Sequence, residues 1–231
     1  MFKDLKKFIK ENLQDKIIEK GLNDYQTFGK NAEEPISDLI EEYLKNNDYT
    51  YTAERAPKKN DFPDLKITLN NQTYALEHKA AASDENPGND LGTLNSFPKK
   101  LKLYKDNIYY IFVKYSKATD DNGIIIEDVY FDKVYKFIGK CDDNPQILKY
   151  REKDGNLRPK SWCDFSNCTS YFNTFNEFKT AIEKTNMYRS ERIVNKHLEK
   201  LDLDGLNRIQ STLTSKKDTL KIKKDTNHPQ D

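Results

Sequence analysis

The sequence has little of what marks secreted, zinc-binding or membrane proteins. It holds three cysteines, Cys141, Cys163 and Cys168, whose odd number and loose spacing argue against a disulfide framework and a zinc site. No apolar run is long enough to cross a membrane, and residues 1–7 open an amphipathic helix rather than a signal peptide. We therefore expect a cytoplasmic protein with free thiols and no membrane partner.

Net charge is also nearly absent. Charged residues make up 33% of the 231 positions, yet the formal net charge is only +1. The overall charge therefore does not indicate a polyanionic partner, and only local clusters of basic residues can do so. There is no internal repeat, and the length is ample for one large domain or a domain with a subdomain.

What is present is a predicted β-hairpin that carries acidic residues. Residues 65–69 alternate apolar and polar side chains, as a half-buried strand does. Residues 70–72, Asn-Asn-Gln, are typical of a turn, and residues 73–80 form a second β-rich run. The segment therefore predicts two antiparallel strands joined by a short connection.

The hairpin predicts a cluster of charged groups. Because side chains alternate along a strand, Glu77 and Lys79 share one face, and pairing through the turn would bring Asp64 close to Glu77. Two carboxylates can hold Mg²⁺, and a neighbouring lysine can orient a water or offset charge on a phosphate. The plainer alternative is a solvated strand face. However, Glu77 and Lys79 lie in an apolar run, where an unpaired charge costs free energy.

Pro63-Asp64, followed after twelve residues by Glu77-His78-Lys79, resembles the motif of the PD-(D/E)xK nuclease superfamily, and of type II restriction endonucleases in particular. The resemblance implies that Asp64 and Glu77 are metal ligands, that Lys79 is the catalytic lysine, and that His78 fills the variable position. It also implies Mg²⁺-dependent hydrolysis of double-stranded DNA at a short specific sequence, leaving 5′-phosphate and 3′-hydroxyl ends.

A further acidic residue precedes the hairpin. Glu33 and Glu34 lie just before Pro35, at the start of a helix predicted over residues 35–45. They resemble the glutamate that many restriction endonucleases carry on the helix before their catalytic strands, and Glu34, which directly precedes the proline, is the preferred catalytic candidate. Glu41 is the fallback. Alternatively, both early glutamates only complement the positive end of the helix.

The remaining pattern predicts an α/β (α+β) fold. Two helices precede a strand at residues 49–55 and the hairpin; a helix broken near Pro98, an apolar strand at 107–115 and a last strand at 124–130 follow. This order matches a restriction-endonuclease-like core, a central mixed β-sheet flanked by helices, with a helical C-terminal region.

The predicted domains follow from where the pattern becomes helical, just after Thr174. We expect a nuclease core with DNA-reading loops over residues 1–172, a helical region over 173–215 that packs on the core or at a dimer interface, and a flexible tail over 216–231.

Basic and amide side chains gather after the hairpin and in two later loops. Such residues neutralise phosphates and read base edges in the major groove. The segment 149–162 is the main candidate for base readout, with Arg158 as preferred reader; alternatively, it is a surface loop with Trp162 in the core. The loop 117–123 is a second reader or only a turn. The predicted DNA-binding residues are Lys99, Lys100, Lys117, Asn122, Arg151, Lys153, Asn156, Arg158 and Lys160.

The resemblance also implies partners. One active site cuts one strand, so we expect a homodimer on a palindromic or near-palindromic site, together with a cognate DNA methyltransferase. Two other hypotheses remain open: another nuclease of the superfamily, such as a junction resolvase or repair nuclease, or a non-catalytic DNA-binding module. The extra loops argue against the former and the intact acid-acid-lysine set against the latter.

Overall fold

The computed structural model describes residues 1–58, 61–119, 123–168, 171–200 and 203–225. The chain divides into two compact units, Met1–Asn186 and Met187–Asp231. The predicted domain boundaries after residues 172 and 215 stay a prediction.

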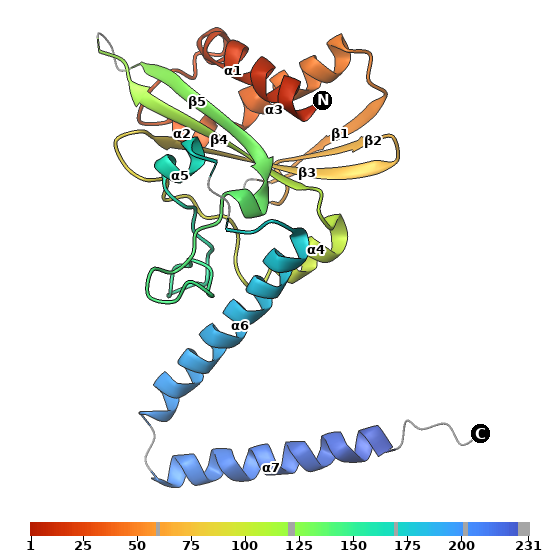
Figure 1. The fold of residues 1–231 in the computed structure, drawn as a ribbon, viewed down its shortest axis with the longest axis vertical. Helices are drawn as coiled ribbons and strands as arrows, with labels where there is room; N and C mark the ends of the chain where they lie inside the picture. The colour runs from red at the N-terminus through yellow and green to blue at the C-terminus, as the bar shows by residue number, and fades with distance from the viewer. Residues whose placement is uncertain (59–60, 120–122, 169–170, 201–202, 226–231) are drawn as a thin grey trace, which may run out of the picture. The chain divides into compact units, whose positions relative to one another are not determined.

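A five-stranded mixed sheet is the centre of the first unit (Figure 1). Its strands follow one another in chain order: β1 (Tyr51–Arg55), β2 (Leu65–Leu69), β3 (Gln72–Ala82), β4 (Ile108–Lys117) and β5 (Ile124–Lys133). All neighbours are antiparallel except β3 and β4, which are parallel because a crossover that contains α4 (Phe97–Tyr104) joins them. The predicted mixed sheet flanked by helices is confirmed.

Helices α1 (Phe2–Glu19) and α3 (Glu33–Asn46) pack on one face of this sheet. The buried side chains of α1 recur every four residues, so one stripe of the helix faces the core. These side chains are Leu5, Ile9, Leu13 and Ile17. Both helices were expected from the sequence, whereas the single turn α2 (Phe28–Asn31) was not.

The opposite face carries a second hydrophobic core. It is covered by α4, the 3₁₀ turn η1 (Val134–Lys136), α5 (Trp162–Ser166) and the first part of α6 (Phe175–Leu198). Strand β4 lies between both cores, and its successive residues Ile111 and Phe112 are each fully buried, one on each side. Burial on both faces explains the nearly continuous apolar run at residues 107–115.

The turn between β2 and β3 determines the register of the hairpin. Asn70 and Asn71 have φ values of 50° and 62°, left-handed conformations that suit a two-residue hairpin connection and that asparagine tolerates. Leu65 consequently pairs with Leu76. Asp64, directly before β2, then lies beside β3, where its carboxylate accepts a hydrogen bond from the backbone of His78.

The second unit consists of the end of α6 and helix α7 (Leu203–Asp225). Helix α7 continues to Asp225, past residue 215, where the sequence predicted the helical region to end. None of the helices in the described ranges is both long and apolar enough to cross a membrane.

Candidate active site

Strand β3 supplies a buried acid and a buried base from neighbouring positions on one face. Lys79 Nζ donates a hydrogen bond to Glu77 Oε1 at 2.8 Å, and the two side chains are only 16% and 13% exposed. Burial by itself lowers the pKa of Lys79, but the carboxylates of Glu77 and Asp64 outweigh it and raise the pKa above its ordinary value. Lys79 is therefore held as an ammonium.

Asp64 joins this pair from the position directly before β2. The backbone N–H of His78 donates to Asp64 Oδ2 at 2.6 Å, which fixes the carboxyl group beside β3. Burial raises the pKa of Asp64 to about 7, and the neighbouring Glu77 carboxylate acts in the same direction. The two acids thus compete for the positive charge of a single lysine.

These donors fit a hard divalent cation. Asp64 and Glu77 present carboxylate oxygens close together, and Glu77 Oε2 is buried without a hydrogen-bond partner in the described part of the chain. Within the same residues, no group of three or more His, Cys, Asp or Glu side chains has metal-binding geometry. A cation here would complete its coordination with water, as Mg²⁺ commonly does.

His78 connects the active strand to helix α3. Its ring is 1% exposed, and Nδ1 lies 3.3 Å from the carbonyl oxygen of Glu33. Burial lowers the pKa of His78 to about 3, so the imidazole is neutral and its Nδ1–H can donate to that carbonyl. The first turn of α3 is thereby attached to β3, a role that the variable position of the motif did not indicate.

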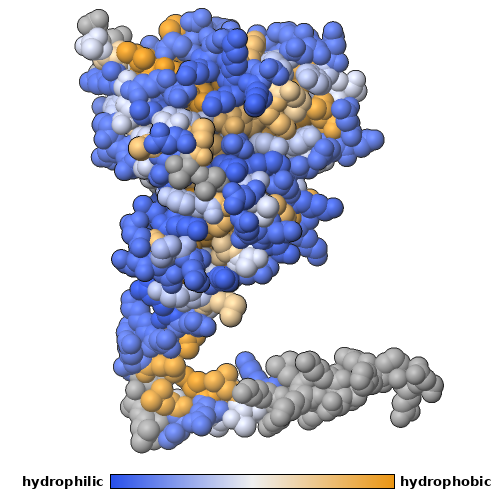
Figure 2. All heavy atoms as spheres, viewed as in Figure 1, coloured by the Kyte–Doolittle hydropathy of each residue, from blue (hydrophilic) through white to orange (hydrophobic). Residues whose placement is uncertain are grey.

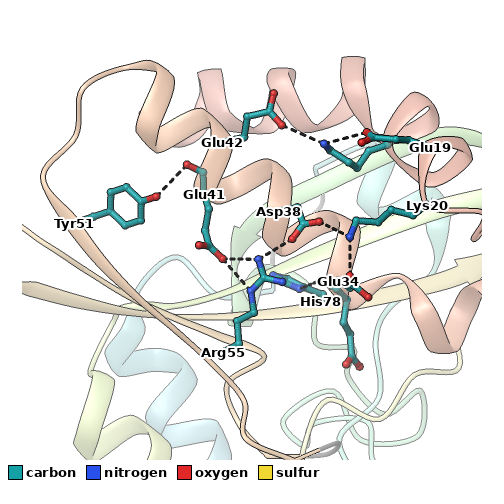
Figure 3. A network of polar contacts seen from close by, with 11 residues as sticks. Glu19, Lys20, Glu34, Asp38, Glu41, Glu42, Tyr51, Arg55 and His78 are labelled. Carbon is teal, nitrogen blue, oxygen red and sulfur yellow. Dashed lines mark hydrogen bonds and ion pairs between the residues drawn. The ribbon is translucent and has the colours of Figure 1, made fainter.

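The two glutamates at the start of α3 have different surroundings. The Glu33 carboxylate is close enough to raise the pKa of both Asp64 and Lys79. The Glu34 carboxylate instead pairs with Lys20 Nζ at 2.6 Å (Figure 3). Both residues, with Asp64, line a cleft of about 350 Å³. The geometry favours Glu33 over the predicted Glu34 as the third acidic residue, because Glu34 already has a partner.

An ion-pair network extends along α3 beside this cleft (Figure 3). Arg55, at the end of β1, binds Asp38 Oδ1 through Nη2 at 2.7 Å and Glu41 Oε1 through Nε at 2.9 Å. Lys20 Nζ also lies 2.7 Å from Asp38 Oδ2. Glu41, the fallback catalytic residue, is therefore neutralised by Arg55.

The segment with the predicted base readers packs next to the crossover that follows β3. The backbone N–H of Leu91 donates to Leu157 at 3.1 Å, and that of Leu157 donates to Gly92 at 3.0 Å. Trp162 is buried at the start of α5, as the alternative for this segment proposed. The candidate DNA contacts of this segment lie about seventy residues after the hairpin in sequence. The fold nevertheless places them beside the crossover that follows β3.

Asp90 holds both arginines of this segment. Its Oδ1 accepts from Arg158 Nη1 at 2.7 Å, and its Oδ2 accepts from Arg151 Nη2 at 2.9 Å. Arg158 Nη1 also donates to the carbonyl oxygen of Gly88, and Arg151 pairs with Asp154. Asp90 was not among the predicted residues, and only its contact across the fold identifies it as an orienting group.

The other predicted DNA contacts differ in exposure. Lys99 and Lys153 are exposed, Asn156 is half-buried, and Lys117 is exposed at the end of β4. Lys160 is only 6% exposed and lies over the Phe165 ring, so its burial does not favour a phosphate contact. Asn122 lies outside the described residues. Lys100 is half-buried and interacts electrostatically with Glu77 and Asp64. All of these assignments stay predictions.

Comparison with known proteins gives one family. A family model described as NgoBV restriction endonuclease matches residues 6–210. Among solved structures, an NlaIV restriction endonuclease superposes with a TM-score of 0.49 at 16% sequence identity, covering 87% of this chain and 94% of that chain. No curated protein matches the sequence.

The electrostatics of the site predict how it responds to loss of one charge. Asp64→Asn keeps the acceptor for the His78 N–H but removes one of two repelling charges, so it should stabilise the metal-free protein by on the order of 1 kcal/mol at pH 8. Thermal unfolding in a chelator measures this. Adding Mg²⁺ should then raise the unfolding temperature of the wild type more than that of the variant.

Asp61→Asn is the matched control, since Asp61 is exposed and three positions from Asp64. It should change neither the unfolding temperature nor the response to Mg²⁺. A destabilised Asp64→Asn protein would show that the carboxylate is not under repulsion.

Proposed function

Because the chain belongs to the NgoBV restriction endonuclease family, we propose that Asp64, Glu77 and Lys79 are its catalytic residues and that Mg²⁺ is its metal ion. The protein is a type II restriction endonuclease, a site-specific deoxyribonuclease. The observation that supports this site is the buried contact of Lys79 with Glu77 beside Asp64, in the only PD-(D/E)xK string that the sequence suggested. A junction resolvase, a repair nuclease or a non-catalytic module is set aside by the family assignment.

The residues of the chain have separate roles in this proposal. Asp64 and Glu77 hold the cation, and the His78 N–H keeps Asp64 in place for that task. Lys79, positioned by Glu77 Oε1, orients the attacking water and offsets negative charge that develops on the phosphate. Glu33 adds a negative charge on the cleft side of Asp64 and helps to position water or metal there.

Mg²⁺ suits these ligands better than a softer metal. Restriction endonucleases generally use divalent metal ions, and a site with two carboxylates and room for water selects a hard cation over zinc or copper. When bound, such an ion polarises the phosphodiester and lowers the pKa of a bound water.

The proposed substrate is double-stranded DNA, bound along the basic residues that surround the site. Lys99 and Lys153 would contact phosphates because both are exposed, whereas Arg158, held in place by Asp90, would read a base. Because an enzyme with this activity would also cut the DNA of its own cell, a cognate methyltransferase would protect that DNA. Both proteins would act in the cytoplasm, where the DNA is.

A homodimer would deliver two cuts. The second unit exposes apolar side chains around the end of α6 and on the first part of α7, where Figure 2 shows hydrophobic atoms gathered. Leu206, Ile209 and Leu213 recur on one face of α7 and line a cavity of about 700 Å³ with Leu198. A monomer seldom leaves such a face in water. A second copy fits it because two active sites are needed for two strands.

The first prediction separates catalysis from binding. Asp64→Asn and Glu77→Gln each remove a charge that the metal needs, so cleavage of unmethylated phage DNA with Mg²⁺ should collapse in both. Affinity for DNA without metal should hold or rise, since each change also removes an anion that repels phosphate. Lys79→Ala should reduce the cleavage rate roughly a hundredfold or more and weaken binding only slightly.

Cleavage on gels and metal-free affinity, measured for wild type and these variants on one DNA fragment, provide the test. Replacing Mg²⁺ by Ca²⁺ should permit binding without cutting. Discrete bands are expected from wild type; a smear would mean that cleavage is nonspecific. Wild-type rates in the Asp64 and Glu77 variants would refute the proposed site.

The second prediction concerns base readout. Arg158→Ala should cost roughly 1–3 kcal/mol of discrimination between cognate and noncognate DNA, because a guanidinium can take a guanine with two hydrogen bonds. Lys153→Ala, in the same segment but exposed, should weaken both DNAs equally. Binding titrations in Ca²⁺ measure both effects. An equal loss in the Arg158 variant would make Arg158 a phosphate contact.

The third prediction concerns the oligomer. Wild type should sediment as a dimer, free or on cognate DNA, and Leu213→Glu should shift it towards monomer by placing a charge on the apolar face of α7. Ser211→Glu, on another side of the same helix, is the matched control and should remain dimeric. A wild type that is monomeric in both conditions would exclude the homodimer.

A further inference from the structure

Lys100 occupies an unusual place for a basic residue of a DNA-binding surface. It lies on α4, and its ammonium is 3.6 Å from the centre of the Phe62 ring and 5.4 Å from that of Phe97. A Cβ atom at Gly92 would lie 2.9 Å from Lys100 Nζ, so glycine at this position leaves the space that the ammonium uses. The side chain therefore points inward from the helix rather than into open solvent.

Helix α4 packs on the face of β3 that carries Ala75 and Ala81, and Glu77 and Lys79 lie on this same face. The ammonium of Lys100 interacts electrostatically with Glu77, Lys79 and Asp64. Phe62, which it covers, is two residues before Asp64. Lys99, the preceding residue on the same helix, is exposed. The two adjacent lysines thus differ in exposure, and Lys100 is the one that lies against the rings of Phe62 and Phe97.

Lys100 interacts with the carboxylates of Glu77 and Asp64 only at a distance. It forms no ion pair with any residue that the structure describes, whereas Lys79 is paired with Glu77. Burial lowers the pKa of Lys100 below its ordinary value, which is the cost of keeping an unpaired ammonium away from water. A phosphate group placed at the acids would supply the missing anion.

A charge count shows what that anion gains. Asp64 and Glu77, the Lys79 ammonium and a divalent cation would together carry one positive charge, which the Glu33 carboxylate cancels. A bound phosphodiester then brings one negative charge, and a second develops on it as the attacking water gives up its proton to the surrounding solvent; nothing in that set balances these charges. The ammonium of Lys100 provides the matching positive charge in a water-poor place, where it acts most strongly.

We propose that Lys100 is a second catalytic lysine, which contacts the scissile phosphate and stabilises the charge that develops on it during cleavage. This proposal rests on the proposed function, because it assumes that Asp64, Glu77 and Lys79 form the active site. It differs from the role as a general DNA contact that the sequence suggested for Lys100, because its effect is on the rate and not on affinity alone.

Single-turnover cleavage separates the two roles. On a fragment with one cut site, saturating Lys100→Met protein with Mg²⁺ should cut roughly a hundredfold more slowly than wild type, as after loss of one preorganised donor. Affinity for the same fragment in Ca²⁺ should fall by less than about tenfold. Lys100→Arg should recover part of the rate, since it restores the charge. Lys7→Met makes the same chemical change at a 76% exposed position on α1 and should leave rate and affinity unchanged.

Unfolding gives a readout that does not depend on activity. Lys100→Met should raise the unfolding temperature of the metal-free protein, because an apolar side chain of similar length replaces an unpaired buried charge. A lysine whose only role was to hold Phe62 through the ring contact would give the opposite result, a lower unfolding temperature. If the Met variant does not fold, Lys100→Gln is measured in the same way.

The outcomes separate this proposal from the one it rests on. The catalytic role of Lys100 would be overturned if the Lys100→Met variant cut at the wild-type rate. It would also be overturned if the variant bound DNA more weakly but regained the wild-type rate at saturating DNA; either result would leave the proposed site intact. No cleavage by wild type, or undiminished cleavage by Asp64→Asn, would instead overturn the proposed function. A slow rate at saturation with nearly normal affinity supports the second lysine.

Discussion

Burial of Asp64 beside Glu77 costs free energy, because two like charges repel more strongly where little water is present. The structure reduces this cost with a small set of contacts. Lys79 pairs with Glu77, and the His78 N–H binds Asp64. The site is left with a surplus of negative charge that a cation can use. Such a surplus is stable only if the surrounding elements hold both acids in place, and the two hydrophobic cores on either side of β3 do so.

Each element around the sheet contributes to that arrangement. The Asn70-Asn71 turn sets the register that brings Asp64 to Glu77. His78 uses its backbone for Asp64 and its neutral ring for the first turn of α3, so one residue positions acidic groups from two elements. Helix α4, which is part of the crossover after β3, holds Lys100 against Phe62, two residues before Asp64. Lys79 on strand β3 and Lys100 on helix α4 thus both carry positive charge. Lys79 is paired with Glu77, whereas Lys100 forms no ion pair within the described residues.

Arg158, the candidate base reader, is also held in place by ion pairs. Asp90 binds Arg151 and Arg158 through its two oxygens, and Asp154 also binds Arg151, so two carboxylates orient and balance the two guanidinium groups. The crossover that carries Asp90 also carries Gly92 and leads into α4. The partner of the candidate base reader and the helix that carries Lys100 are therefore attached to one segment.

Local sequence alone determined the hairpin, because strand alternation, the two asparagines and the spacing from Asp64 to Glu77 act over fewer than about twenty residues. It likewise determined the internal strand β4, since only burial on both faces accommodates its apolar run. Contacts between distant segments decided the rest. Glu33 acts on the pKa of Asp64 while Glu34 pairs with Lys20 because of how α3 packs, Lys100 lies against Phe62 because of the crossover, and Asp90 meets Arg158 only in the folded chain. Residue type shows which groups can carry charge, but only tertiary packing shows which of them meet, because separation in space is not encoded in separation along the chain.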